Sequence, residues 1–257
     1  MTEPRVAVLI DADNTSGSAA GLVIAEASRH GRLVIRRVYG DWTTNALQKW
    51  KAVLADHAMQ PAQQFANTVG KNATDSALII DAMDLLHADA AEVFCIVSSD
   101  ADFTRLASRL RESAKVVVGI GRRKTPKAFV QACERFIFLE NLTASPADDD
   151  DKPRKPKAPV PARSAKEPPQ PEPELDDDGD DEVQPIGPLL ARAYDNAEGD
   201  DGFAHLGSIG NQLMRLDPSF DPRTYGFRQL RQLVARQPGY TVATLPGGDA
   251  LIVRRGG

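Results

Sequence analysis

Two short apolar runs in this sequence each lead into aspartates. Residues 93–97 form an uninterrupted apolar run, and Asp100 and Asp102 follow shortly after it. Residues 5–10 form a second run, which stops at Asp11 in an Asp-Ala-Asp sequence. Runs this short indicate strands that are buried on both faces. Because ligands gather outside the carboxyl ends of the strands in an open parallel sheet, the two endings predict a shared acidic site. Helix capping is the simpler alternative, but it explains one such ending more easily than two.

Strand and helix patterns alternate through the first part of the chain. The strands are expected at residues 5–10, 33–39, 60–65, 93–97, 116–120 and 136–139. The helices are expected at residues 22–30, 45–57, 75–87, 103–114 and 127–134. This alternation predicts an α/β domain with a doubly wound, largely parallel sheet between two layers of helices.

The composition changes abruptly after residue 145. Residues 146–183 hold half of the chain's 18 prolines and no aromatic residue, and a basic segment is followed there by a strongly acidic one. Such a segment cannot bury enough apolar surface to offset its ordering entropy, so we expect a disordered linker. It also accounts for the net charge of −5, because charges nearly balance on either side of it. The expected organisation is a domain at 1–145, a linker at 146–183 and a domain at 184–257.

The last part of the chain has the pattern of a separate, small winged helix-turn-helix domain. Three helical patterns occur, at residues 189–194, 206–214 and 225–236. Two short strand patterns follow, joined by the hairpin sequence Pro246-Gly-Gly-Asp249.

The acidic residues favour a site for a hard divalent cation. Asp11, Asp100 and Asp102 meet if the first and fourth strands are neighbours, and Asp75 enters from the start of a helix that Thr74 caps. Carboxylates that lie close together repel one another, and without a cation some of them must take up protons. Oxygen ligands without His or Cys select Mg²⁺ or Mn²⁺, which can activate water for phosphodiester hydrolysis.

Three motifs in order resemble the NYN family of PIN-like, metal-dependent ribonucleases. They are Leu9-Ile-Asp-Ala-Asp-Asn14, the segment from Lys71 to Asp81, and Val97-Ser-Ser-Asp-Ala-Asp-Phe103. The resemblance implies a PIN-like fold and a catalytic metal site. The implied ligands and catalytic residues are Asp11, Asp75, Asp100 and Asp102, and the supporting residues are Asp13, Asn14, Lys71, Asp81, Ser98 and Ser99. Asp13 is also a helix-cap candidate. Asp81 is about 120° around its helix from Asp75, so a structural role is an equal alternative for it.

Residues 184–254 resemble an OST-HTH (LOTUS) domain, a family regarded as RNA-binding modules. The resemblance rests on Pro185-Ile-Gly-Pro-Leu-Leu190, on the segments 206–213 and 220–227, and on the hairpin. A basic helix beside a wing can hold a phosphate backbone, although a solvated arginine face is the alternative. The expected RNA-binding residues are Arg36, Trp42, Arg223, Arg228, Arg231 and Arg236.

The sequence therefore predicts a Mg²⁺- or Mn²⁺-dependent ribonuclease with a tethered RNA-binding domain. A PIN-like domain that binds RNA or protein without cutting is one alternative. A haloacid-dehalogenase-like phosphatase is another, since Asp11 and Asp13 also resemble its opening motif, but no later aspartate follows Asp102 before the linker. RNA is the expected partner, and the linker or the C-terminal domain offers a surface for a protein partner. The sequence has only two cysteines and begins without the pattern of a signal peptide, so we expect a cytoplasmic protein. It has no apolar run long enough to span a bilayer, so we expect no membrane association.

Overall fold

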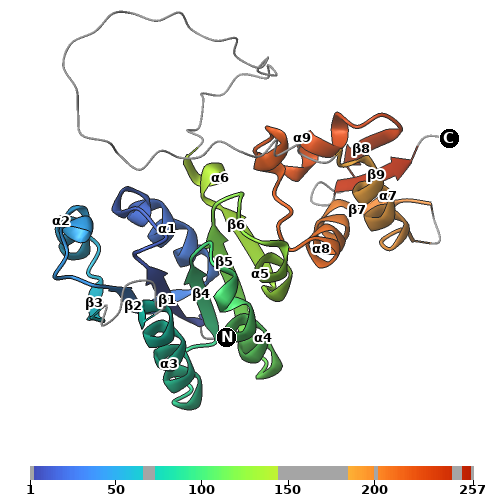
Figure 1. Cartoon of the computed structure of the whole chain (residues 1–257). Coiled ribbons are helices and arrows are strands. Elements are labelled where there is room, and N and C mark those ends of the chain that lie inside the picture. The colour runs from blue at the N-terminus through green and yellow to red at the C-terminus, as the bar shows by residue number, and fades with distance from the viewer. Residues whose placement is uncertain (1–2, 66–72, 144–184, 200–201, 245–250, 256–257) are drawn as a thin grey trace, which may run out of the picture.

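The computed structural model describes residues 3–65, 73–143, 185–199, 202–244 and 251–255. Two folded regions are present, one before and one after the long undescribed segment (Figure 1). Lys71, the proposed linker at 146–183 and the hairpin turn at 246–249 lie outside the described residues. Within the described part of the chain, no helix has both the length and the apolar character that crossing a membrane requires.

The first region is built on one parallel sheet of six strands. The strands are β1 (Arg5–Asp11), β2 (Arg32–Gly40), β3 (Gln60–Gln63), β4 (Val93–Val97), β5 (Val116–Gly121) and β6 (Arg135–Phe138). Their spatial order is β3-β2-β1-β4-β5-β6, and every neighbouring pair is parallel. Residues 93–97 are buried throughout, as expected for a strand covered on both faces.

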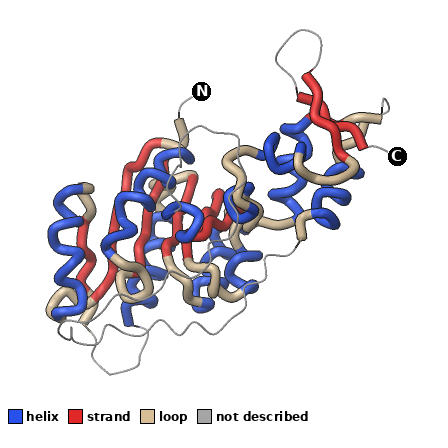
Figure 2. Tube along the Cα trace, turned by 90° about the horizontal axis from the view of Figure 1, so that it is seen from above, coloured by secondary structure: helices blue, strands red, loops and turns tan. Residues whose placement is uncertain are grey.

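Helices cover both faces of this sheet (Figure 2). Successive residues of β1 point to opposite faces, so Val8 joins one core and Leu9 joins the other. The first core includes residues of α1 (Ala20–Ala27), α2 (Gln48–Asp56) and α6 (Leu139–Thr143). The second includes residues of α3 (Ala73–His87), α4 (Thr104–Glu112) and α5 (Lys127–Ala132). The predicted doubly wound, three-layer α/β/α architecture is confirmed.

Helix α3 is placed by one apolar stripe. Leu78, Ala82 and Leu85 recur every three or four residues and are buried against the sheet. Asp75 lies in the first turn of the same helix and is also buried. The packing of the stripe therefore carries the start of α3, and Asp75 with it, to the sheet.

The second region contains helices and a small antiparallel sheet, as a winged helix-turn-helix requires. Its helices are α7 (Gly187–Asp195), α8 (Leu206–Leu216) and α9 (Leu230–Ala235), with a 3-10 turn, η5 (Pro222–Tyr225), between α8 and α9. The strands β8 (Tyr240–Thr244) and β9 (Leu251–Arg255) form the hairpin, and β7 (Ala204–His205) pairs with β9. The predicted small second domain is confirmed.

The third helix of this domain is shorter than its sequence pattern predicts. Gly226 has a φ of +81° directly after η5, a conformation that ends a helical segment and favours glycine. Helix α9 then begins only at Leu230. Arg228 therefore precedes the helix and Arg236 forms its C-cap, so the expectation that one continuous helix presents both arginines is wrong.

Candidate active site

The carboxyl ends of β1 and β4 lie side by side in the middle of the sheet. From β1 the chain winds outward through β2 to β3, and from β4 it winds the other way through β5 to β6. Ligand sites of such sheets lie where the winding reverses, which here is between β1 and β4. Asp11 ends β1, and the loop with Asp100 follows β4, so the two acidic endings meet as expected.

Asp11 is fully buried, and its carboxylate is held on both oxygens. Oδ1 accepts hydrogen bonds from the backbone N–H groups of Asp13, at 3.0 Å, and Asn14, at 3.3 Å. Oδ2 accepts from Nδ2 of Asn14 and Oγ of Ser98, each at 2.8 Å. Burial raises the pKa of Asp11, and the hydrogen bonds from Asn14 and Ser98 act in the opposite direction. Asp11 thus joins the loop after β1 to the end of β4.

The loop after β4 is fixed by its own serines and by a cap. Oγ of Ser98 accepts a hydrogen bond from the Asp100 N–H at 3.1 Å. Asp100 is the N-cap of η4 (Ala101–Phe103), where its Oδ1 accepts from the Asp102 N–H at 2.9 Å. The capping interpretation is therefore correct for Asp100, and the same cap sets the position of the carboxylate.

Arg122 is a residue at this edge that the sequence reasoning missed. Its backbone N–H donates to Oγ of Ser99 at 2.8 Å and so joins the loop after β5 to the loop after β4. Its position directly after a strand of the same sheet was the available signal, because every such loop starts at the same edge.

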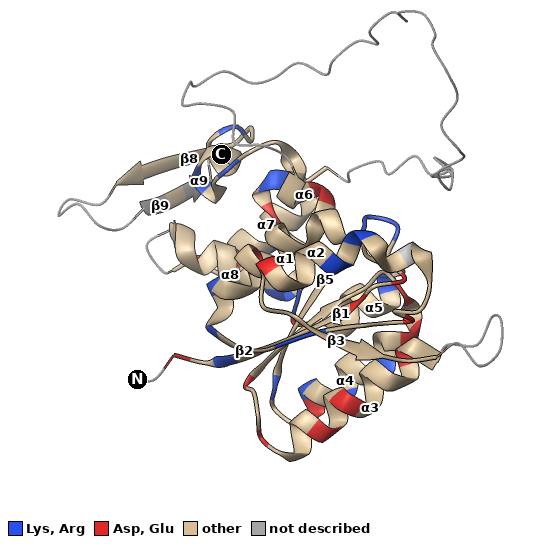
Figure 3. Ribbon diagram, turned by 90° about the vertical axis from the view of Figure 1, so that its left-hand side faces the viewer, with Lys and Arg blue, Asp and Glu red and all other residues tan. Residues whose placement is uncertain are grey.

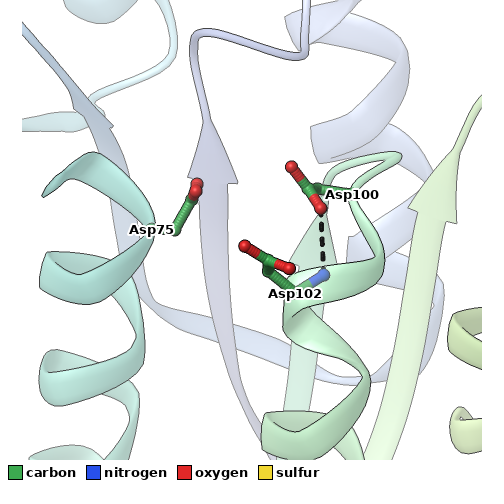
Figure 4. Close-up of side chains that lie close together, drawn as sticks. All are labelled: Asp75, Asp100 and Asp102. Carbon is green, nitrogen blue, oxygen red and sulfur yellow. Dashed lines mark hydrogen bonds between the residues drawn. The ribbon is translucent and has the colours of Figure 1, made fainter. Parts of the chain in front are cut away.

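Three carboxylates from two elements come together beside these loops (Figure 4). Asp75 comes from the first turn of α3, and Asp100 and Asp102 come from the turn after β4. Each offers an oxygen atom that lies within 4.8 Å of those of the other two. Asp75 is buried, Asp100 is half-buried and Asp102 is exposed, so the group is reachable from one side. We call these three residues the acidic cluster; Asp11 is not one of them.

Burial and neighbouring charge perturb the cluster. The pKa of Asp75 is raised to about 6 from an ordinary value of 3.8. Burial is the largest cause, followed by the negative charges of Asp11, Asp100 and Asp102. A divalent cation would relieve this repulsion, and oxygen-only ligands suit Mg²⁺ or Mn²⁺. The residues present therefore fit such an ion.

The expected supporting residues differ in their contacts. Asn14, Ser98 and Ser99 make the hydrogen bonds described above. Asp13 is exposed and contributes negative charge near Asp75. Lys71 lies outside the described residues.

Asp81 is bound away from the acidic cluster. Its two carboxylate oxygens accept hydrogen bonds from Nη1 of Arg37 and from the hydroxyl of Tyr39. Burial and the hydrogen bond to Asp81 raise the pKa of the Tyr39 hydroxyl. Arg37 and Tyr39 belong to β2, so Asp81 ties α3 to the sheet.

Replacing Asp81 by alanine is expected to lower the free energy of unfolding by about 1–3 kcal/mol, because the buried Tyr39 hydroxyl and Arg37 lose a charged partner. The response to a divalent cation should survive, since Asp81 does not face the acidic cluster. Urea unfolding with and without Mn²⁺ measures both. Asp84→Ala, at an exposed position one turn later on α3, is the matched control. Equal stability of the two variants would show that the Arg37–Asp81–Tyr39 contacts add nothing.

Arg36 and Trp42, two expected RNA-binding residues, have partners within their own domain. Nη1 of Arg36 donates to the carbonyl oxygen of His57 at 2.9 Å. Nε1 of Trp42 donates to the carbonyl oxygen of Ala62 at 3.0 Å. Both residues are half-buried, and these contacts tie Arg36 to the end of α2 and Trp42 to β3.

The four arginines expected to bind RNA in the C-terminal domain differ in their surroundings. Arg223 is half-buried and forms ion pairs with Asp221 and with Glu26 of α1. Arg228, Arg231 and Arg236 are exposed, in and around α9. Of the four, these three belong to the exposed surface, whereas Arg223 does not.

Comparison with known families agrees with this geometry. The sequence model of the NYN domain matches residues 5–140, more than half of the chain. The chain belongs to the NYN family. The match covers the whole sheet and all three residues of the acidic cluster. An OST-HTH/LOTUS domain is matched at residues 184–251, over the winged helix-turn-helix. An NYN domain joined to an OST-HTH/LOTUS domain supports an RNA-related nuclease function.

Two solved structures that resemble this chain have no described function. Protein VPA0982 of Vibrio parahaemolyticus, described as of unknown function, is 16% identical with a TM-score of 0.46, over 55% of this chain and 95% of its own. An uncharacterized protein from gene locus NE0665 of Nitrosomonas europaea is 31% identical with a TM-score of 0.25, over 40% of this chain and 91% of its own. No curated protein matches the NYN chain.

Proposed function

We propose that this NYN protein is a metal-dependent ribonuclease that cuts RNA internally at the acidic cluster. The observation that carries the proposal is the approach of Asp75, Asp100 and Asp102 to within 4.8 Å of one another, next to the place where the winding of the sheet reverses. Membership in the NYN family and the joined OST-HTH/LOTUS domain support RNA as the substrate.

The acidic cluster would hold one or two Mg²⁺ or Mn²⁺ ions. When bound, such an ion supplies an activated water and stabilises the leaving oxygen of a phosphodiester. Asp100 uses Oδ1 for its cap, which leaves Oδ2 for a cation. Asp11 contributes in two ways: it adds negative charge beside Asp75, and it holds the loops after β1 and β4 together.

The full burial of Asp11 counts against the phosphatase alternative. A nucleophilic aspartate must reach the phosphorus atom of its substrate. Both oxygens of Asp11 instead accept hydrogen bonds from the surrounding loops. The remaining alternative is an NYN domain that binds RNA or a partner protein without cutting, and cleavage assays separate it from the proposal.

Incubation of the full chain with end-labelled RNA tests the proposal. We expect internal cleavage products with millimolar Mn²⁺ or Mg²⁺ and none with EDTA, because the cluster needs a cation to bring a phosphodiester near three carboxylates. Cleavage that continues in EDTA would contradict the metal site. Intact RNA with either metal, despite measurable RNA binding, would favour the non-cutting alternative.

We propose that the exposed arginines around α9 bind the RNA backbone. Figure 3 shows basic positions of this region in blue. Replacing Arg228 and Arg231 together by alanine should weaken binding of all RNA sequences alike. The slope of log K against log salt should fall by about 1.4 to 1.8, since two phosphate contacts release their counterions. Fluorescence anisotropy at several salt concentrations measures this. Arg192→Ala with Arg215→Ala, two exposed arginines on α7 and α8, is the control pair. An unchanged slope would place the RNA elsewhere.

The cysteines agree with a cytoplasmic protein, which we also propose. Cys95 and Cys133 are both buried free thiols. Burial raises the pKa of each thiol to about 12, so neither is poised as a reactive thiolate. Reducing compartments maintain cysteines in this form.

A further inference from the structure

Among the described residues, three polar contacts join the C-terminal domain to the NYN domain. The backbone N–H of Phe136 in β6 donates to the carbonyl oxygen of Pro218 at 2.8 Å. Nδ2 of Asn141 in α6 donates to Oγ1 of Thr224 at 2.9 Å. Nη1 of Arg223 lies 3.7 Å from Oε2 of Glu26 in α1. All the C-terminal partners come from the short segment 218–224, between α8 and α9 (Figure 1).

The first contact covers an open edge. β6 is the last strand of the six-stranded sheet, and within the described ranges its one strand partner is β5. The outer N–H groups of an edge strand need a partner or water, and a bare edge invites association with other chains. The Pro218 carbonyl gives Phe136 such a partner, and both residues are buried.

The ion pair involves a carboxylate that is almost removed from water. The Glu26 side chain is 4% exposed, and Oε2 also accepts from Nη1 of Arg29 at 3.1 Å. Arg223 is held in turn by Asp221, whose carboxylate it contacts with two nitrogen atoms. A buried carboxylate is costly unless it is paired, so the arrival of a second arginine at Glu26 favours the docked state.

The third contact leads toward the acidic cluster. Oδ1 of Asn141 accepts a hydrogen bond from Nη2 of Arg123 at 3.1 Å, while Nδ2 of the same amide holds Thr224. The preceding residue, Arg122, donates its N–H to Ser99 in the loop that carries Asp100. One side chain, Asn141, therefore links the C-terminal domain to the loop after β5, which is itself hydrogen-bonded to the loop that carries Asp100.

We propose that the C-terminal domain is docked on the NYN domain in solution through the segment 218–224, with Glu26, Phe136 and Asn141 as its receptor surface. Arg223 and Thr224 then serve docking, whereas the residues proposed to bind RNA are the exposed Arg228, Arg231 and Arg236. Docking also steadies the loop after β5 through Asn141. The division between docking residues and RNA-binding residues rests on the proposed function, whereas the docking itself does not.

Amide hydrogen exchange in the intact chain, followed by NMR, tests the docking without any assay of cleavage. The Phe136 N–H is bonded only across the interface, so it should exchange slowly in the wild-type protein. Arg223→Gln should speed this exchange roughly tenfold to a hundredfold, as expected for the loss of a charged hydrogen-bonded partner. Thr224→Val keeps the side-chain shape and should speed exchange of both Phe136 and Arg122, by a smaller factor.

Two controls make the result decisive. Arg231→Gln removes an exposed arginine of the same domain and should leave the Phe136 amide unchanged. The amide of Leu213, fully buried in α8, reports whether a variant still folds its C-terminal domain. A Phe136 amide that exchanges at the unprotected rate in the wild type would overturn the proposal. The proposal would also be overturned if the Phe136 amide were equally protected in Arg223→Gln, Thr224→Val and Arg231→Gln while the Leu213 amide still exchanged slowly.

Discussion

Replacing Asp100 by asparagine is expected to reduce metal-dependent RNA cleavage by about a thousandfold or more. Asp100 is one of three carboxylates whose oxygens lie within 4.8 Å of one another. Removing its charge takes away a proposed ligand of the cation. A bound metal lowers the barrier by several kcal/mol, and a loss of ~4 kcal/mol of this stabilisation already slows the reaction about a thousandfold.

The substitution separates chemistry from folding. Asparagine keeps the oxygen that accepts from the Asp102 N–H, and both residues are good N-caps, so η4 should persist. Single-turnover cleavage in Mn²⁺ measures the rate, and circular dichroism checks the fold. Asp84→Asn, an exposed aspartate on α3, is the matched control and should cut normally. Wild-type rates from a folded Asp100→Asn protein would remove Asp100 from the site.

Replacing Asp75 by asparagine is expected to stabilise the metal-free protein above pH 6, by on the order of 2 kcal/mol. Folding raises the pKa of Asp75 from 3.8 to about 6, so the folded state binds this proton more tightly than the unfolded state does. The wild type therefore loses stability as pH rises from about 4 to about 6, and the loss persists at higher pH. Asparagine resembles the protonated carboxyl and removes that part of the pH dependence.

Divalent cations should reverse the order of the two proteins. An ion that binds only the folded wild type adds about 2.7 kcal/mol at a hundredfold excess over its dissociation constant. Asp75→Asn lacks one of the proposed ligands, so Mn²⁺ should stabilise it much less. Urea unfolding at pH 5 and pH 7.5, in EDTA and in Mn²⁺, gives all four comparisons, with Asp84→Asn as control. An Asp75→Asn protein less stable than wild type in EDTA at pH 7.5 would show that repulsion in the cluster is not the dominant effect of this carboxylate.

The sequence by itself determined the parts whose signals are local. Short apolar runs specify buried strands where helices cover both faces of the sheet, as in β1, β4 and β5, whereas β2 and β3 keep exposed residues. All six strands occur where the sequence predicts them, within a few residues. The aspartates that follow residues 5–10 and 93–97 could be identified as candidate site residues because they come shortly after these strand patterns. Topology then brings these ends together, since parallel strands all end at one edge.

The tertiary structure alone decided what each charged group contacts. Asp75 and Asp81 lie on one helix, yet Asp75 reaches the acidic cluster while Asp81 binds Arg37 and Tyr39 of β2. Helical spacing placed them on different faces but could not name the partners, because these lie more than forty residues away in the chain.

The C-terminal domain shows the same division. Periodicity indicated its helices and hairpin, whereas the positive φ of Gly226 ended one helical segment and left Arg228 outside α9. Arg223 looked like a member of a basic surface, and folding instead brings it to the buried Glu26 of another domain. A local pattern gives the charge of a residue, but its partner depends on long-range packing, which is decided only when the whole chain has folded.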